Sequence, residues 1–249
     1  MEVTAIINRK GGVGKTATAH NLGAGLKRKK KRVLFIDLDS QANLSYTMDA
    51  KTDGLTILDV MEDGADINEA IQHTPQGDIV PGAPGLATAD STLTATGKEY
   101  RLKEALEKLK AEYDYIIIDT PAQLGILTIN ALTAANNAII PVQAEIYSLQ
   151  GIGLLNETIE AVKKYTNSLL YIKGILTTRY NNRAVISRDM QSNLEDLAKK
   201  LYTTCYKTPI RECTALKEAA TMQQDIFTYA PKSNAAADYN AFIAEYLKA

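Results

Sequence analysis

The sequence predicts an α/β fold in which a mostly parallel sheet carries helices on both faces. Short, apolar, β-branched runs alternate with longer stretches whose apolar residues recur at helical spacing. Strands that are apolar throughout are buried on both faces, and regular alternation with helices indicates parallel pairing. The predicted strands are Val3–Ile7, Val33–Asp37, Tyr115–Asp119, Ala138–Val142 and Tyr171–Thr177, and the predicted helices are Thr16–Lys27, Tyr100–Ala111, Thr128–Asn136, Leu149–Tyr165 and Ile186–Leu201.

The chain has 249 residues, of which 45% are hydrophobic and 23% charged, as is usual for a globular protein. No repeat, low-complexity linker or step in composition divides it, so we expect a single domain over residues 1–249. Gly77–Gly85 contains two Pro and three Gly and is predicted to be a loop. Residues 40–98 are the least periodic, and we expect loops that recognise partners there.

Charge and cysteine content exclude several function classes. Twenty-eight Lys and Arg against 29 Asp and Glu give a net charge of −1, so any affinity for nucleic acid needs a local patch. The two Cys, Cys205 and Cys213, and the two His, His20 and His73, are not expected to assemble a disulfide framework or a zinc site. The chain begins without a leader pattern and contains no apolar run of about 18 residues. We therefore expect a cytoplasmic protein that does not enter a membrane.

A glycine-rich segment, Arg9–Thr16 (RKGGVGKT), follows the first predicted strand and runs into the first predicted helix. Glycines let successive backbone N–H groups point at phosphate oxygens, and the helix N-terminus adds partial positive charge. Lys15 is placed for β- and γ-phosphates and Thr16 for Mg²⁺. The strict Walker A pattern fails at Arg9, and a second lysine, Lys10, precedes the glycines. Such turns also occur without ligands, but GGVGKT between a strand and a helix favours a nucleoside triphosphate site.

Further motifs occur in a fixed order after this loop. They are Asn21-Leu22, Val33–Asn43 (VLFIDLDSQAN), Asp119-Thr120-Pro121-Ala122, Thr177–Asn181 and Pro209–Arg211. Together with Lys10–Thr16, they resemble the ParA/MinD superfamily of deviant Walker A ATPases over nearly the whole chain. The resemblance implies a P-loop NTPase fold with ATP and Mg²⁺ as cofactors.

The resemblance also implies roles for individual residues. Asp119 ends a buried strand, which places its carboxylate at the carboxyl edge of the sheet beside the phosphate loop. Asp39 would position the attacking water, and Lys10 would cross a homodimer interface to the partner's ATP as a cation supplied in trans. Solvated strand caps and a solvated turn lysine are the alternatives. The predicted catalytic residues are Lys10, Lys15 and Asp39; the metal residues are Thr16, Asp37 and Asp119; and the nucleotide-binding residues are Lys10, Gly11, Gly12, Val13, Gly14, Lys15, Thr16, Ala17, Thr178, Arg179, Pro209 and Arg211.

Two loops, the one after Asp39 and Thr120–Gly125, resemble switches that sense the γ-phosphate. The second departs from the family, because Pro121-Ala122-Gln123 replaces the more usual Pro-Pro pair.

Several features select a branch of the superfamily. The C-terminal stretch lacks the cationic face of a MinD-like membrane helix, so we expect it to dock on its own sheet. Cys205 and Cys213 come too late in the chain for the cluster of nitrogenase iron proteins. The chain resembles the short, Soj-like form, which binds DNA without sequence preference. Candidate DNA contacts are Arg179, Arg183, Arg188, Arg211 and Lys217.

The densest basic run, Lys27–Arg32, could be a nucleic-acid patch. It lies where the first helix ends, however, and cations there stabilise the helix dipole. We favour the helix-end interpretation.

The sequence therefore predicts a Mg-dependent ATPase of plasmid or chromosome partition. ATP would close a homodimer that holds non-specific DNA on the nucleoid, and a ParB-like centromere-binding protein would stimulate hydrolysis. The alternatives are an ATPase that positions another cargo without DNA and an ATP-gated scaffold that barely hydrolyses. Asp39 argues against the scaffold.

Overall fold

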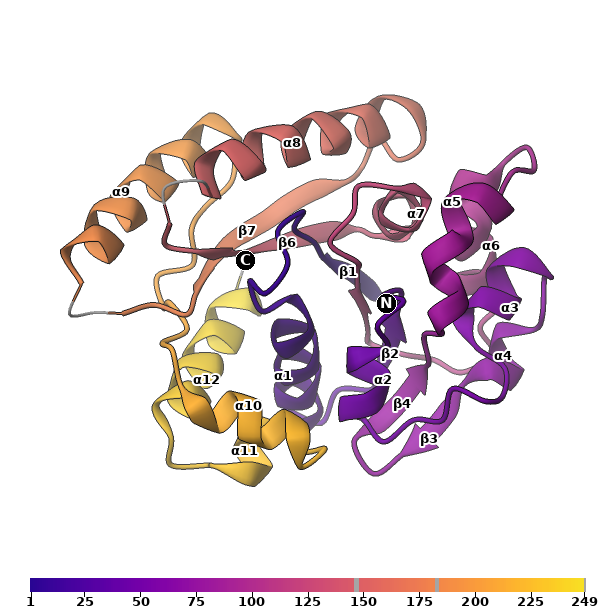
Figure 1. The fold of residues 1–249 in the computed structure, drawn as a ribbon, viewed down its shortest axis with the longest axis horizontal. Helices are drawn as coiled ribbons and strands as arrows, with labels where there is room; N and C mark the ends of the chain where they lie inside the picture. Colours follow the sequence, from indigo (N-terminus) through magenta and orange to yellow (C-terminus); the bar gives the residue numbers. More distant parts are fainter. Residues whose placement is uncertain (146–147, 182–183, 249) are drawn as a thin grey trace.

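A seven-stranded sheet in the order β3-β4-β2-β5-β1-β6-β7 forms the centre of the computed structural model, which describes residues 1–145, 148–181 and 184–248 (Figure 1). The strands are β1 (Glu2–Ile6), β2 (Val33–Asp37), β3 (Gln72–Thr74), β4 (Gly77–Val80), β5 (Tyr115–Asp119), β6 (Asn137–Gln143) and β7 (Tyr171–Thr178). Every neighbouring pair is parallel except β3 and β4, which form an antiparallel hairpin at one edge. The predicted mostly parallel sheet is confirmed.

Helices cover both faces of the sheet, and each face has its own apolar core (Figure 1). One face carries α3 (Ile57–Glu62), α4 (Ile67–Ala70), α5 (Ala89–Thr92), α6 (Arg101–Leu106), α7 (Ile126–Ala134), α8 (Ser148–Tyr165) and α9 (Val185–Lys200). The other carries α1 (Lys15–Arg28), α2 (Asn43–Thr47), α10 (Thr214–Thr221), α11 (Ile226–Tyr229) and α12 (Asn234–Tyr246). Two short 3₁₀ turns, Pro84–Thr88 and Lys98–Tyr100, precede α5 and α6.

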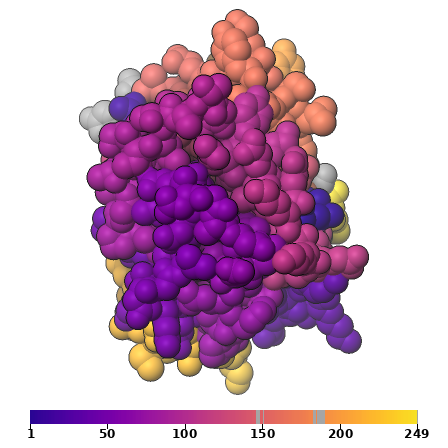
Figure 2. Space-filling view, turned by 90° about the vertical axis from the view of Figure 1, so that its right-hand side faces the viewer, coloured from indigo at the N-terminus to yellow at the C-terminus, as the bar shows by residue number. Residues whose placement is uncertain are grey.

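The least periodic part of the sequence gives the largest differences from prediction. The loop predicted at Gly77–Gly85 is wrong at its start, because Gly77–Val80 forms β4 beside β2. This short strand also pairs with β3 in a hairpin, and Thr74 closes the turn by donating to the Gly77 carbonyl at 2.9 Å. The helix predicted over Tyr100–Ala111 ends at Leu106. Figure 2 shows that the middle of the chain builds most of one face.

The C-terminal helix docks on the molecule, as predicted. Phe242 and Tyr246 of α12 are fully buried in the core that also contains residues of α1. Gly25 allows the close approach, since a Cβ there would lie 2.1 Å from Ile243. The Lys27–Arg32 run begins at the end of α1, where Lys27 donates to the Gln76 carbonyl, so the helix-end interpretation holds. Among the described residues, no helix has the length and apolar character needed to cross a bilayer.

The parallel strands bring their carboxyl ends to one edge of the sheet. The loop after β1 lies there beside the ends of β2, β5, β6 and β7. Asp37 and Asp119 are register partners on β2 and β5. Ligands of open α/β sheets bind outside this edge, and the predicted site residues lie along it.

Candidate active site

A cavity of about 810 Å³ opens at the carboxyl edge of the sheet. The loop after β1, both predicted switch loops, the end of β7 and α10 line it. The predicted residues on its wall are Gly11, Gly12, Gly14, Lys15, Thr16, Ala17, Asp39, Thr178, Arg179, Arg211 and Lys217. Lys10, Val13, Asp37, Asp119 and Pro209 are not on the wall, and Ile210 takes the place expected for Pro209. The structure thus brings most of the predicted nucleotide residues around one space.

The phosphate loop has the curled backbone that its glycines predict. Gly12 and Gly14 adopt φ values of 75° and 85°, in the left-handed region that favours glycine. Two side chains outside the loop hold it: Gln143 donates to the Gly12 carbonyl at 2.9 Å, and Thr178 donates to the Val13 carbonyl at 2.7 Å. Gln143 was not among the predicted residues, although a polar residue ending a buried strand was a signal available for it.

Lys15 and Asp119 form an incomplete charged site beneath the loop. The Lys15 side chain is buried, and among the described residues its Nζ donates only to the Lys10 carbonyl, at 3.5 Å. Burial lowers the pKa of Lys15, against the opposing effect of Asp119 and Asp39. Asp119 is fully buried, and neither carboxylate oxygen has a hydrogen-bond partner in the part of the chain that the structure describes. Burial raises the pKa of Asp119 well above its usual value, and the nearby Asp37 raises it further to a smaller extent.

A buried carboxylate without a partner is costly unless a cation or donor completes it. Thr16 lies on the cavity wall, and its hydroxyl, although outside hydrogen-bonding geometry, is close enough to Asp119 to lower the pKa of that carboxyl. A divalent cation held by the Thr16 hydroxyl next to Asp119 would supply the missing positive charge. The residues present therefore fit a magnesium nucleotide.

Asp37 holds the first switch loop rather than facing the cavity. One carboxylate oxygen accepts from the Ser45 N–H at 2.8 Å and the Ser45 hydroxyl at 2.7 Å, and the other accepts from the Asp39 N–H at 3.1 Å. Burial raises the pKa of Asp37 to about 6 despite these bonds. Ser45 in turn accepts from the Gly82 N–H at 2.9 Å. Asp37 thus ties α2 to the sheet, and its role at a metal stays a prediction.

Asp39 and Lys10 occupy the open side of the site. Asp39 lines the cavity and accepts from the Gln41 N–H at 3.0 Å. Lys10 pairs with Glu145 of its own chain, and both side chains are about half-exposed. This surface ion pair is weak enough to exchange for another anion. The action of Lys10 in trans stays a prediction.

The second switch loop is anchored by Asp90, a residue that the sequence did not point to. Pro121, Ala122, Gln123 and Gly125 line the cavity. The Ile126 N–H, which begins α7, donates to Asp90 of α5 at 2.7 Å. A change in this loop would therefore be felt by α5, on the face shown in Figure 2.

The predicted DNA contacts differ in their surroundings. Arg211 forms an ion pair with Asp238 at 2.6 Å, and Arg179, at a φ of 49°, pairs with Glu212 at 2.9 Å. Arg211 is thus held by a buried carboxylate, whereas the Arg179–Glu212 pair is about as exposed as the Lys10–Glu145 pair. Contact of either arginine with DNA stays a prediction. Lys217 is exposed and has no ion pair within the described ranges. Arg183 lies outside the described residues, and Arg188 belongs to α9 but its side chain is not described.

Known proteins are similar to this chain in sequence. A family model described as an AAA domain matches residues 1–172. The sporulation initiation inhibitor protein Soj of Bacillus subtilis (strain 168) is 40% identical over 243 residues, covering 96% of this chain and 95% of Soj. The chromosome partitioning protein ParA of Myxococcus xanthus (strain DK1622) is 37% identical over 99% of this chain and 88% of its own length. The chain belongs to the ParA/Soj family of P-loop partition ATPases.

A solved structure with the fold of this ParA/Soj family member contains a bound nucleotide analogue and magnesium. Cobyrinic acid a,c-diamide synthase from Mycobacterium smegmatis, with bound ATP analogue and magnesium, is 34% identical and superposes with a TM-score of 0.86. The match covers 100% of this chain and 95% of that one. A structural relative of this closeness supports the nucleotide interpretation of the cavity.

Proposed function

We propose that this chain is a Mg-dependent ATPase of DNA partition that works as an ATP-switched homodimer. The observation that carries the proposal is the buried pair of Lys15 and unpartnered Asp119 beneath a curled glycine loop. Mg²⁺, held at Thr16, would neutralise phosphate charge when bound. The family and the ligands of its structural relative support both cofactors.

The residues of the site divide the work of hydrolysis. Lys15 and the N–H groups at the start of α1 would bind and orient the β- and γ-phosphates. Asp39, exposed to the cavity, would position the attacking water and accept its proton. The buried Asp119 would fix the shell of the metal. Pro121–Gly125 would exclude bulk water and report the γ-phosphate to α5 through Asp90.

Dimerisation would couple ATP binding to DNA binding. Lys10 would leave Glu145 for the partner's nucleotide, so the closed dimer would depend on ATP. Two DNA-binding faces joined in one dimer can raise apparent affinity by about 10²–10⁴-fold. A ParB-like centromere-binding protein would stimulate hydrolysis and release the DNA. We expect a cytoplasmic, nucleoid-associated protein.

Retardation of a random-sequence DNA duplex tests this proposal. Asp39→Ala protein with ATP should bind, the same protein with ADP should not, and binding should fall steeply with salt as counterions are released. Equal binding with both nucleotides, or none with either, would remove the DNA-dependent function.

A second candidate is an ATPase that positions another cargo without using DNA. The ion pair of Arg211 with buried Asp238 favours keeping it, because one of the expected DNA contacts is neutralised within the chain. The same experiment separates the two functions, since this candidate predicts ATP-driven dimers that do not retard DNA.

A further inference from the structure

Segment 207–212 is held between the end of β7 and the last helix. On the β7 side, the Ile210 N–H donates to the Thr177 carbonyl at 2.8 Å, and the Tyr180 N–H donates to the Ile210 carbonyl at 3.0 Å. The Glu212 N–H continues this pairing by donating to the Tyr180 carbonyl at 3.1 Å. Ile210, Arg211 and Glu212 then face the cavity. The segment is thus a wall of the site rather than a connecting loop on the surface.

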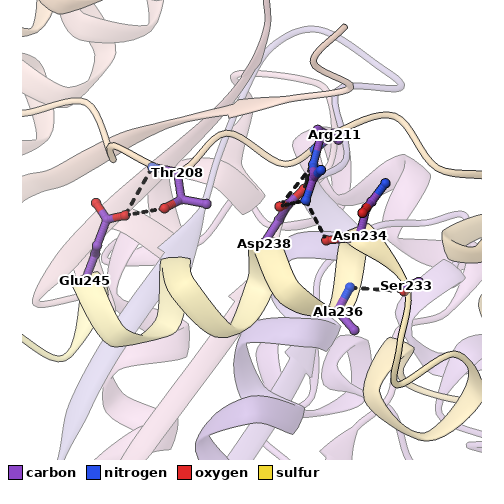
Figure 3. A network of polar contacts seen from close by, with 7 residues as sticks. All are labelled: Thr208, Arg211, Ser233, Asn234, Ala236, Asp238 and Glu245. Carbon is purple, nitrogen blue, oxygen red and sulfur yellow. Dashed lines mark hydrogen bonds and ion pairs between the residues drawn. The ribbon is translucent and has the colours of Figure 1, made fainter. Parts of the chain in front are cut away.

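Two carboxylates of α12 hold this segment from the other side (Figure 3). Glu245 accepts from the Lys207 N–H at 2.7 Å, the Thr208 N–H at 3.1 Å and the Thr208 hydroxyl at 2.7 Å. Asp238 accepts from the Arg211 N–H at 3.0 Å and from its guanidinium at 2.9 Å and 2.6 Å. Residues seven apart on a helix share a face and lie about 10 Å apart. The two carboxylates therefore fix both ends of one short segment.

The attachment through Asp238 is the stronger of the two. The Asp238 side chain is 7% exposed, so little water could stabilise its negative charge if the bond to Arg211 were lost. Charged hydrogen bonds of this kind contribute more than neutral ones, and breaking one leaves the buried partner unsatisfied. The helix itself is fixed by the buried aromatic side chains Tyr239, Phe242 and Tyr246. A rigid element thus carries the carboxylates.

The position of residues 210–212 indicates which part of a nucleotide they would contact. Thr178 contacts the phosphate loop directly through its bond to Val13, and the 210–212 wall adjoins Thr178 and Arg179. Phosphates bound at Gly11–Thr16 would leave the nucleoside beside this wall. Apolar Ile210 and Leu216 alternate there with polar Arg179 and Glu212, as suits an aromatic base and a sugar.

We infer that Asp238 and Glu245 are positioning residues that hold segment 207–212 against the cavity, and so set the affinity of the site for the nucleoside part of its nucleotide. This inference rests on the proposed nucleotide binding. Neither carboxylate lines the cavity, so the affinity for the triphosphate group should not depend on them.

The test compares ATP with inorganic triphosphate, which lacks the nucleoside. Affinities for both, in the presence of Mg²⁺, are measured by calorimetry on the full chain carrying Asp238→Asn or Glu245→Gln. ATP should bind roughly 5- to 30-fold more weakly to Asp238→Asn. Glu245→Gln should have a smaller effect in the same direction. Its amide oxygen can still accept from Thr208, and only the acceptor for the Lys207 N–H is lost. Triphosphate affinity and kcat should stay within about twofold while KM for ATP rises.

Asp196→Asn is the matched control, because Asp196 pairs with Lys199 at 3.0 Å on exposed α9. It should leave both affinities unchanged. Thermal unfolding identifies a variant that fails to fold. If one variant does, the other still tests the inference, because Asp238 and Glu245 hold opposite ends of the segment. Unchanged ATP affinity in both, or equal loss for ATP and triphosphate, would overturn the inference alone. A wild-type chain that binds neither ligand would overturn the proposed function as well.

Discussion

The two walls of the cavity are built in different ways. The phosphate wall is a contiguous run, Arg9–Thr16, held mainly by uncharged hydrogen bonds from Gln143 and Thr178. The second wall, 207–212, is held by carboxylates that lie 27 to 38 residues further along the chain. The first wall gets its shape from glycine backbone and a helix N-terminus, whereas the second depends on how α12 docks. Substitutions should therefore act locally on the first wall and through α12 on the second.

The largest effect is expected from Lys15→Ala in the phosphate wall. The variant removes the buried cation and leaves Asp119 next to the phosphates without compensation, so ATP affinity should fall about 100- to 1,000-fold. Nucleotide titration measures it, with Lys29→Ala, an exposed lysine at the far end of α1, as control. Unchanged affinity in Lys15→Ala would mean that the phosphates bind elsewhere.

Asp39→Ala and Lys10→Ala should separate chemistry from closure within the same wall. Asp39→Ala should bind ATP, lose hydrolysis by about 100-fold, and accumulate as a dimer, because closure precedes the chemical step. Lys10→Ala should bind ATP yet remain monomeric. Sedimentation with ATP, together with phosphate release, measures both. A Lys10→Ala protein that dimerises and hydrolyses normally would exclude the action of Lys10 in trans.

The difference between the walls also explains what the sequence could predict. The phosphate loop and Asp119 were predictable because their geometry follows from consecutive residues and a strand end. Ser45, Asp90 and Glu145 were not, since each contributes through an interaction that only the folded chain creates.

The same reason accounts for the ion pairs at the predicted DNA contacts and for the differences in the fold. Arg179 and Arg211 look like free cations in sequence, but the fold places Glu212 and Asp238 against them. The short strand β4 escaped prediction because only its pairing with β2 and β3 defines it. Asp238 and Glu245 lie in a helix whose docking was predicted, yet nothing local indicates what their carboxylates hold.

The stability of the folded chain should depend on pH through His20, a buried histidine of α1. Burial lowers the pKa of His20 on α1 to about 4. Its unfolded form, with a pKa near 6.5, takes up a proton first, so the contribution of His20 to stability is present above pH 6.5 and is lost as pH falls toward 4. Between pH 7 and 5 the loss should be about 2 kcal/mol.

The raised pKa of Asp37, about 6, acts in the opposite direction, because the folded state then takes up the proton first. Denaturant unfolding of wild type and His20→Gln across this range therefore isolates His20 as the difference between the two profiles. His73→Gln, at an exposed histidine, is the control. Parallel profiles for wild type and His20→Gln would contradict the assignment.

The smallest effect is expected at the rim of the second wall, where Lys217 is exposed on α10 without an ion pair in the described part of the chain. If Lys217 meets a DNA phosphate in the ATP-bound dimer, Lys217→Ala should weaken DNA binding about two- to fivefold and leave ATP-driven dimerisation intact. The logarithmic salt slope should become shallower by about one for every phosphate that is no longer neutralised. Lys29→Ala is again the control, because Lys29 follows the end of α1 that lies away from the phosphate loop. A general loss of charge would affect both variants equally, so an identical salt slope for the two would exclude an interaction of Lys217 with phosphate.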